Sequence, residues 1–438
     1  MALLSQKGVL GSDAELQSVS ERVGGYPLSL VLIAGWLLAE EPADPQVRYL
    51  PGDLWALEGR YQGARQLSVE AVFNWSVGRL EARLRQMLWQ LSILRQPFSA
   101  TTAAAVAPDQ NPSEADLRQL DRRALLQLLP GQDRDGQRLF RWQPQVRELA
   151  QRRAGDQSAA HERAVRHFAG RVRPLQQARE NQRQTETDQL QDYLEVFHHL
   201  CELGNYGAAL GWLTQETQAG EKYSSCDFWM QLSGYNDLRE ALYRRLVEEW
   251  RPQDEDRRGY GYAQEKLGDV LQFLKQCDAA IALYDDAIAT YQQVGARLGY
   301  ANALKAKADV LQFLKQCDAA IALYDEAIAT YQQVGARLGY ANALCSRASL
   351  LDDAAAALEA FQQAQQIYID INDSYSQARN LILYICGAQA ALGQVDAAID
   401  SLQQAAAIGE AIGMGMFVQA AQQIIAALQE IVAQSQEP

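Results

Sequence analysis

Residues Asp269–Leu304 read DVLQFLKQCDAAIALYDDAIATYQQVGARLGYANAL, and residues Asp309–Leu344 repeat this stretch with one change, Asp286 to Glu326. The two 36-residue copies start 40 positions apart. A fixed period of about 20–50 residues is the signature of a repeat architecture, in which neighbouring units stack on each other. The duplication therefore decides the fold of the C-terminal part of the chain.

Each copy contains two amphipathic helices. The first apolar stripe recurs at steps of three and four residues, the spacing of one helix face: Ala280, Ile281, Tyr284, Ala287, Ile288 and Tyr291. A second stripe runs through Ala301, Leu304, Ala308 and Leu311 into the next repeat. Gly295 is suited to end a helix between them, and Asp278 to cap the start of one. Neither helix buries its face alone, so the sequence predicts a mainly all-α fold containing a stacked α-solenoid.

The small and large residues of the repeat resemble the tetratricopeptide pattern. Gly268, Ala280, Tyr284 and Ala287 match a pattern in which small residues let two helices approach and an aromatic ring fills the gap. Gln292 stands where the family has its closing proline, and the period of 40 exceeds the usual length of about 34 residues. Degenerate copies follow at 357–364 and 395–405, and the pattern at 417–428 predicts a last helix that closes the stack.

The tetratricopeptide resemblance implies that the first helix of each repeat lines a groove for a protein or peptide. Carrying the family's groove positions onto this sequence gives Tyr262, Glu265, Asp269, Gln272, Phe273, Asn302, Lys305, Asp309, Gln312 and Phe313. An alternative stays open: these residues are ordinary solvated positions, and the two copies are alike because the duplication is recent and no ligand has been selected.

The N-terminal part resembles a different family. Residues 24–30 read GGYPLSL, which is similar to the "GLPLAL" segment of the NB-ARC (STAND) ATPases. In that family the proline lies against the adenine nucleotide, so the resemblance implies a nucleotide contact at Pro27. From the residues alone, the apolar run Leu28–Ala39 predicts a buried helix that follows a glycine hinge.

A helical region and a hairpin follow. Residues Ser68–Ser92 and Leu117–Leu129 have helical spacing, and Asp135-Gly136 lies between two short apolar runs, which is a hairpin signal. Helices followed by a hairpin resemble the winged-helix part of the NB-ARC family. The family's phosphate-sensing histidine is replaced by Gln143.

The order of the parts agrees with the NB-ARC resemblance. We expect a partial NB-ARC helical module at 1–62, a winged-helix module at 63–155, a helical linker with degenerate repeats at 156–258, and the tetratricopeptide-like solenoid with a C-terminal capping helix at 259–438. A phosphate-binding loop requires G-x-x-x-x-G-K-[ST], and the sequence contains no Gly-Lys dipeptide. We therefore expect the ATPase part to precede residue 1 or to be a separate chain.

Charge and composition narrow the partners. The formal net charge is −14, and residues 259–438 hold 9 Lys and Arg against 19 Asp and Glu. Such a surface repels nucleic acids and anionic membranes and favours basic or neutral proteins. The six cysteines have no CxxC spacing, no histidine pair has zinc-site spacing, and no cofactor motif is present. We expect a cytoplasmic protein with no membrane segment, metal or catalytic residues.

One segment runs against the acidic balance. Residues 115–183 contain fifteen arginines and eight acidic residues. A basic winged helix binds DNA in some proteins, but arginines interleaved with acids more often form i,i+4 pairs on a solvated helix.

Three functional hypotheses follow. The preferred one is a non-enzymatic scaffold, in signalling or regulation, that binds a protein or peptide in the solenoid groove. The second is the sensor half of a split or truncated NB-ARC switch, which completes an ADP/ATP site in a P-loop NTPase chain. The third is a DNA-binding regulator that uses the winged helix.

Overall fold

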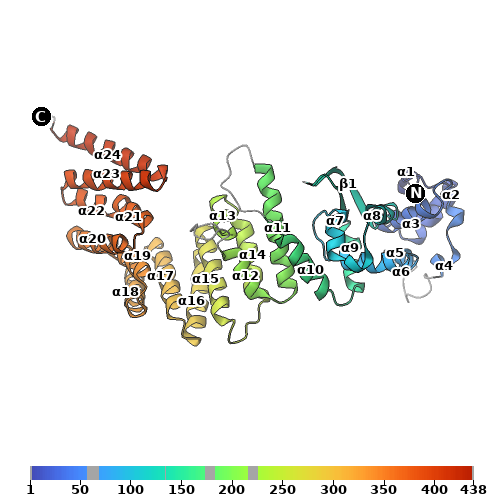
Figure 1. Ribbon diagram of the computed structural model, residues 1–438, viewed down its shortest axis with the longest axis horizontal. Helices are drawn as coiled ribbons and strands as arrows, with labels where there is room; N and C mark the ends of the chain where they lie inside the picture. Colours follow the sequence, from blue (N-terminus) through green and yellow to red (C-terminus); the bar gives the residue numbers. More distant parts are fainter. Residues whose placement is uncertain (1, 57–68, 134, 173–182, 216–224, 437–438) are drawn as a thin grey trace. The chain divides into compact units, whose positions relative to one another are not determined.

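The computed structural model describes residues 2–56, 69–133, 135–172, 183–215 and 225–436 (Figure 1). The chain divides into two compact units, Met1–Cys226 and Asp227–Pro438. Helices dominate the described residues of both units, and one two-stranded sheet occurs among them. The predicted fold class, mainly α with a helical solenoid and one short hairpin, is confirmed.

The first unit begins with short helices and continues through a hairpin into longer helices. Its elements are α1 (Ala2–Gln6), α2 (Asp13–Arg22), α3 (Pro27–Glu40), η1 (Val47–Tyr49), α4 (Gly52–Trp55), α5 (Val69–Gly78), α6 (Ala82–Leu91), α7 (Ala100–Val106), η2 (Pro108–Gln110), α8 (Glu114–Arg122), β1 (Leu126–Gln132), β2 (Arg138–Trp142), α9 (Pro144–Arg153), α10 (Ser158–Ala169), α11 (Arg183–Glu202) and α12 (Tyr206–Thr214). The two units divide at the first residue of α13 (Cys226–Leu232).

Helix α3 is the buried apolar helix that the sequence predicts. Gly24 and Gly25 both take left-handed φ angles, of 66° and 69°, which turn the chain between α2 and α3. Pro27 follows as the first residue of α3, where its missing N–H costs no hydrogen bond. Gly35 packs so closely that an added Cβ would lie 2.6 Å from the Arg123 carbonyl carbon. These contacts fix α3 against the segment that enters the hairpin.

The hairpin forms where the Asp-Gly pair predicts it. β1 and β2 are antiparallel, with Leu126 opposite Trp142. The Asp133 carboxylate accepts hydrogen bonds from the Asp135 and Gln137 amides over 2.9 and 2.8 Å, and Gly136 takes a φ of 75°. The hairpin is confirmed, and helices α6–α8 precede it. The identification of this region as a winged helix stays a prediction.

The second unit is a succession of antiparallel helices. Its elements after α13 are α14 (Asn236–Glu249), α15 (Arg257–Phe273), α16 (Cys277–Gln293), α17 (Arg297–Phe313), α18 (Cys317–Val334), α19 (Arg337–Ala348), α20 (Ala354–Asp370), α21 (Ser374–Asn380), η3 (Leu381–Ile385), α22 (Cys386–Ala391), α23 (Val395–Ala411) and α24 (Gly415–Gln436). Consecutive helices from α15 to α20 pack on each other, and α15, α17 and α19 are also neighbours (Figure 1). The helix that the sequence predicts at 417–428 lies within α24.

Buried tyrosines fill the space between paired helices. Tyr284 and Tyr324 have no exposed surface. A Cβ added to Gly268 would lie 2.7 Å from the Tyr284 ring, and one added to Gly299 would lie 2.4 Å from the Tyr291 ring. The small-and-large packing that the repeat pattern predicts is therefore present in the core.

The long helices of the duplicated segment end in one kind of turn. Lys275 takes a left-handed φ of 61°, and the Gln276 amide donates to the Leu271 carbonyl over 2.9 Å. Helix α16 consequently begins at Cys277, and Asp278 lies inside its first turn. The predicted capping role of Asp278 is wrong, because this turn starts the helix earlier than the apolar pattern indicates.

Candidate functional site

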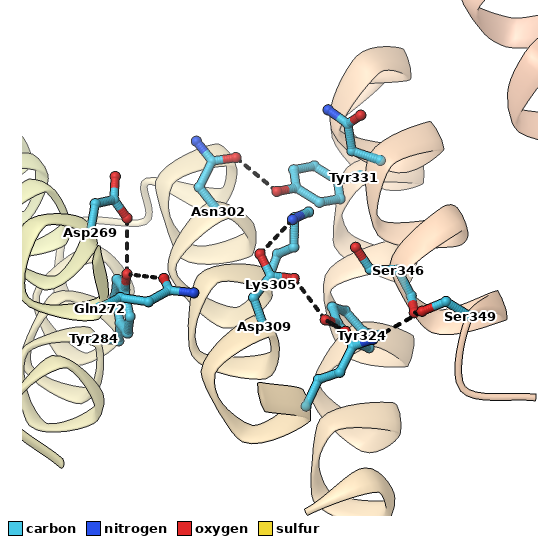
Figure 2. Close-up of polar contacts among 12 residues, drawn as sticks. Asp269, Gln272, Tyr284, Asn302, Lys305, Asp309, Tyr324, Tyr331, Ser346 and Ser349 are labelled. Carbon is cyan, nitrogen blue, oxygen red and sulfur yellow. Dashed lines mark hydrogen bonds and ion pairs between the residues drawn. The ribbon is translucent and has the colours of Figure 1, made fainter. Parts of the chain in front are cut away.

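The candidate groove is the surface shared by helices α15, α17 and α19, one from each of three consecutive repeats (Figure 2). Four residues of α15 and α17 define a pocket of about 560 Å³ there, Asp269, Asn302, Lys305 and Asp309, together with Asn342 of α19. Asp269 also lines a second pocket of about 460 Å³, which contains Gln272, Phe273 and Phe313. We call the first the Asn pocket and the second the Phe pocket.

The structure thus brings seven of the ten predicted groove residues to two adjoining pockets. The other three line neither pocket. Glu265 is buried and 6% exposed, and Tyr262 is half-buried. The Gln312 amide donates to the Ser349 hydroxyl over 2.9 Å. The role of all ten in ligand binding stays a prediction.

Two asparagines of the Asn pocket are oriented by buried tyrosines of the second helix of each repeat. The Tyr331 hydroxyl donates to Asn302 Oδ1 over 2.8 Å (Figure 2). The Tyr368 hydroxyl donates to Asn342 Oδ1 over 2.9 Å. Arg379, which has no acceptor, donates to the same Asn342 oxygen over 2.7 Å and so fixes that amide. With Oδ1 occupied, the NH2 group of each amide is the part that remains to donate to a ligand.

Two lysine–aspartate pairs lie between the asparagines and the ends of the helices. Lys305 contacts Asp309 at 2.7 Å, and Lys266 contacts Asp269 at 2.6 Å. Each aspartate also accepts a tyrosine hydroxyl, from Tyr324 over 2.7 Å and Tyr284 over 2.9 Å.

Burial and the neighbouring carboxylate raise the pKa of both phenols, Tyr284 and Tyr324, which therefore remain donors. Each carboxylate is thus bound by a tyrosine and a lysine, and the lysines line the pockets, Lys266 the Phe pocket and Lys305 the Asn pocket.

Glu265 is the one carboxylate of this region that is enclosed. Burial raises its pKa to about 7, and the Tyr291 hydroxyl donates to its Oε2 over 2.9 Å. Tyr291 is the counterpart of Tyr331 in the preceding repeat. Here the tyrosine stabilises an internal group instead of orienting an amide at the surface.

Apolar residues flank the polar strip at both ends of the helices. Leu298 and Leu338 begin helices α17 and α19 and line the Asn pocket, with exposures of 44% and 41%. Phe273 and Phe313 end helices α15 and α17, with exposures of 60% and 63%. The groove therefore presents hydrogen-bond donors in its middle and apolar side chains at its rims.

The negative charge of the solenoid is concentrated on the other helices. The exposed acidic residues of α16 and α18 are Asp278, Asp285, Asp286, Asp318, Asp325 and Glu326. Lys307 and Arg347 pair with Asp285 and Asp325, so the first helices of each repeat neutralise part of this surface. The acidic balance of the sequence consequently describes α16 and α18 better than it describes the groove.

Sequence reasoning missed Asn342, Leu298, Leu338 and Lys266. Asn342 is 40 positions after the predicted Asn302, so extending the period to a third repeat would have found it. Leu298 and Leu338 are also 40 positions apart, but neither was predicted. Lys266 gave no such signal, because Ala306 occupies its position in the next repeat.

In the first unit Pro27 is exposed at the start of α3. Its proposed contact with a nucleotide stays a prediction. Several arginines of the basic segment are engaged in i,i+4 pairs, with Arg118–Glu114 at 2.6 Å and Arg152–Glu148 at 2.5 Å. This pairing is the pattern of a solvated helix face and gives no support to DNA binding.

The part of the chain that the structure describes contains neither a candidate metal site nor a candidate membrane-spanning helix. Within those ranges no three His, Cys, Asp or Glu side chains are grouped to hold a metal ion. None of the described helices combines the length and the apolar character that crossing a membrane requires.

Residues 261–333 match the family model of the tetratricopeptide repeat, which confirms the resemblance for that segment. The match spans α16 and α17 and most of α15 and α18. The comparison with curated proteins gave no match.

Among solved structures, the chain is similar to a signal transduction ATPase with numerous domains (STAND) that has a tetratricopeptide repeat sensor, from Pyrococcus horikoshii. The TM-score is 0.53 and the identity 14%, over 96% of this chain and 54% of that one. The chain thus spans about half of that protein and shares its fold over this length.

Two further structures were matched at lower TM-scores. Aspartyl phosphate phosphatase F from Bacillus subtilis has a TM-score of 0.43 at 14% identity, over 78% of each chain. A Rap protein in complex with competence and sporulation factor has a TM-score of 0.41 at 14% identity, over 64% of this chain and 88% of that one.

Proposed function

We propose that this chain is a non-catalytic interaction scaffold that binds an extended segment of a protein in the groove of α15, α17 and α19. The observation that carries the proposal is the pair of asparagines, Asn302 and Asn342, whose carbonyl oxygens are occupied by tyrosines. Each leaves an amide donor at the same pocket, one per repeat.

The spacing of these donors suits a backbone. Packed helices lie about 8–10 Å apart, and an extended chain in the polyproline II conformation advances about 3.1 Å per residue with three residues per turn, so its carbonyls three residues apart point the same way. Donors on neighbouring first helices therefore match carbonyl groups about three residues apart on a ligand. Hydrogen bonds to a backbone are independent of side chains, so the amides hold a segment while the rims select its sequence.

The test begins with random dodecapeptides displayed on phage and selected on the full chain. A selected peptide is synthesised, and its affinity is measured by fluorescence anisotropy. Asn302→Asp keeps the oxygen that accepts from Tyr331 but replaces the amide donor, so we expect affinity to fall at least about tenfold. Gln332→Ala, at an exposed position of α18, is the matched control and leaves affinity unchanged. Equal affinities for all three proteins would refute the assignment of the groove.

A second candidate is the sensor half of a STAND-type switch. The fold likeness to the Pyrococcus protein over 96% of the chain favours it. In this proposal, residues 1–62, 63–155 and 156–258 are the helical module, winged helix and linker, and Pro27 completes an adenine-nucleotide site on a P-loop NTPase chain.

The measurement for this candidate is co-purification: the full chain is isolated from the cytoplasmic fraction and tested for a bound P-loop NTPase. We expect Pro27→Ala to leave that complex intact and to weaken its nucleotide affinity. If no P-loop protein co-purifies, the switch proposal fails and the scaffold proposal is unaffected.

A further inference from the structure

Two identical tetrapeptides end consecutive first helices of the solenoid. Phe273-Leu274-Lys275-Gln276 closes α15, and Phe313-Leu314-Lys315-Gln316 closes α17. The phenylalanines are among the most exposed large apolar side chains of the described chain, at 60% and 63%. Both line the Phe pocket, although they come from different repeats. An exposed aromatic pair around one pocket is a feature of binding sites more than of solvated surfaces.

The turn that follows each phenylalanine is strained. Lys275 and Lys315 have φ angles of 61° and 59°, a region in which a residue with a Cβ is disfavoured relative to glycine. The equivalent turn after α22 reads Ala391-Leu392-Gly393-Gln394, and there Gly393 has a φ of 71°. The chain therefore uses glycine where alanine ends the helix and a lysine where phenylalanine ends it. Ala124 and Asn372 also take positive φ angles, of 58° and 55°, so such turns occur elsewhere in the described chain; after α15 and α17 they place a lysine two residues beyond each exposed phenylalanine.

The Phe pocket is lined by one more cationic side chain than acidic side chains. Arg239 binds both carboxylate oxygens of Asp227, over 2.8 and 3.2 Å, and Lys266 pairs with Asp269 at 2.6 Å. These pairs neutralise the two aspartates of the pocket wall. Lys275 is exposed and lines the same pocket. It forms no ion pair with any residue that the structure describes.

We propose that the Phe pocket anchors an aromatic or branched apolar side chain of the bound protein segment, and that a neighbouring carboxylate of the segment pairs with Lys275. The inference rests on the proposed scaffold function and adds the chemistry that selects the ligand. The surplus lysine complements an acidic group, and the acidic surfaces of α16 and α18 repel such a group elsewhere. The Phe pocket and Lys275 would therefore select segments that have an apolar side chain next to an acidic residue.

The experiment compares phage-displayed random dodecapeptides selected on four forms of the full chain: wild type, the double variant Phe273→Ala/Phe313→Ala, Lys275→Glu and Lys275→Gly. We expect the wild type to enrich an apolar residue beside Asp or Glu. The double variant should bind the resulting peptide at least about tenfold more weakly by fluorescence anisotropy. Lys275→Glu should reverse the preference to Lys or Arg beside the apolar residue.

Lys275→Gly separates charge from folding. Glycine relieves the strained turn, so this variant retains or gains thermal stability while losing the preference for an acidic neighbour. Ile369→Ala removes an exposed apolar side chain of α20 and is the control for general loss of surface area.

The outcomes separate the two proposals. If the wild type enriches no peptide, the scaffold function itself is refuted. If it enriches peptides whose binding depends on Asn302 but is unchanged in all the Phe-pocket variants, only the anchor proposal is overturned.

Discussion

The two copies of the duplicated stretch are almost the same sequence and have different surroundings. In the first, Tyr291 donates its hydroxyl to buried Glu265. In the second, its counterpart Tyr331 donates to Asn302, which faces a pocket. The acceptor differs because the residues 26 and 29 positions before each tyrosine are not the same. They are Glu265 and Tyr262 before Tyr291, and Lys305 and Asn302 before Tyr331.

This difference separates what builds the repeat from what gives it specificity. The duplicated residues supply the tyrosines, the glycines that fit against them and the turns between helices. The residues 26 and 29 positions before each tyrosine decide whether it closes an internal site or orients an amide at a pocket. Variation at these few positions changes the groove while the packing of the helices is retained.

The largest effect tests whether the copies share a core. Tyr291→Ala and Tyr331→Ala each remove an almost fully buried ring, and we expect each to reduce the free energy of unfolding by about 3–5 kcal/mol. Urea unfolding of the full chain, followed by circular dichroism, measures both. Losses that differ by more than about 2 kcal/mol would show that the copies are not equivalent in packing.

The second prediction concerns pH, because only the first copy is preceded by a buried glutamate, Glu265. The pKa of Glu265 rises from 4.5 to about 7 on folding because the side chain is buried. The folded chain then holds the proton more tightly, so this group's contribution to stability is full below pH 4.5 and is lost as the pH rises through 7. Relative to wild type, Glu265→Gln should gain up to about 3 kcal/mol between pH 4.5 and 8.

Thermal unfolding across this pH range provides the measurement for Glu265→Gln. Glu326→Gln changes an exposed carboxylate in the second copy and serves as the control. A stability difference from wild type that is constant with pH for Glu265→Gln would contradict the burial of an ionisable group there.

A third comparison removes only hydroxyl groups. Tyr291→Phe at pH 8 leaves a buried carboxylate without its donor and should cost about 1–3 kcal/mol. Tyr331→Phe leaves the half-buried Asn302 oxygen, which water can reach, and should cost about 0.5–1.5 kcal/mol. Chemical denaturation of both variants at pH 8 decides the order. The reverse order would mean that the Asn302 contact is the stronger of the two.

The smallest effect concerns the one residue by which the copies differ. The Tyr300 hydroxyl donates to the Glu326 carboxylate, and the first copy has the shorter Asp286 instead. Glu326→Asp shortens the acceptor at an exposed site, so we expect a loss below about 0.5 kcal/mol, and Asp286→Glu should be neutral. A larger change in denaturation midpoint would show that this substitution is a structural difference.

The solenoid fold was predictable because the same helical pattern occurs in two copies of one stretch. The stripe that includes Tyr284 and Tyr291 fixes one buried face, and the period fixes which helices are equivalent. The hairpin was predictable from Asp135-Gly136 for a local reason, since that dipeptide tolerates the positive φ of the turn. The start of α16 was misplaced, because a left-handed Lys275 is not expected from a sequence in which glycine usually marks such a turn.

The candidate site was predictable only as a set of positions. The spacing places Asn302, Lys305 and Asp309 on one helix face. It does not show which of these side chains pair with each other. Burial of Glu265 depends on packing against Tyr291 from another helix, which spacing along one helix does not contain. The orientation of Asn342 depends on Arg379, a residue in a degenerate repeat with little sequence likeness to the first two.

The ends of the duplicated stretch lie inside helices. The first copy begins within α15 and ends within α17, between Leu304 and Lys305. Recombination between the matching coding segments would therefore join half of one helix to half of another in the same helical phase, with no new loop. Gain or loss of a 40-residue block would add or remove one tyrosine-held amide and one lysine-bearing turn together. The length of the groove can thus change in whole steps over generations, each step extending or shortening the ligand that fits.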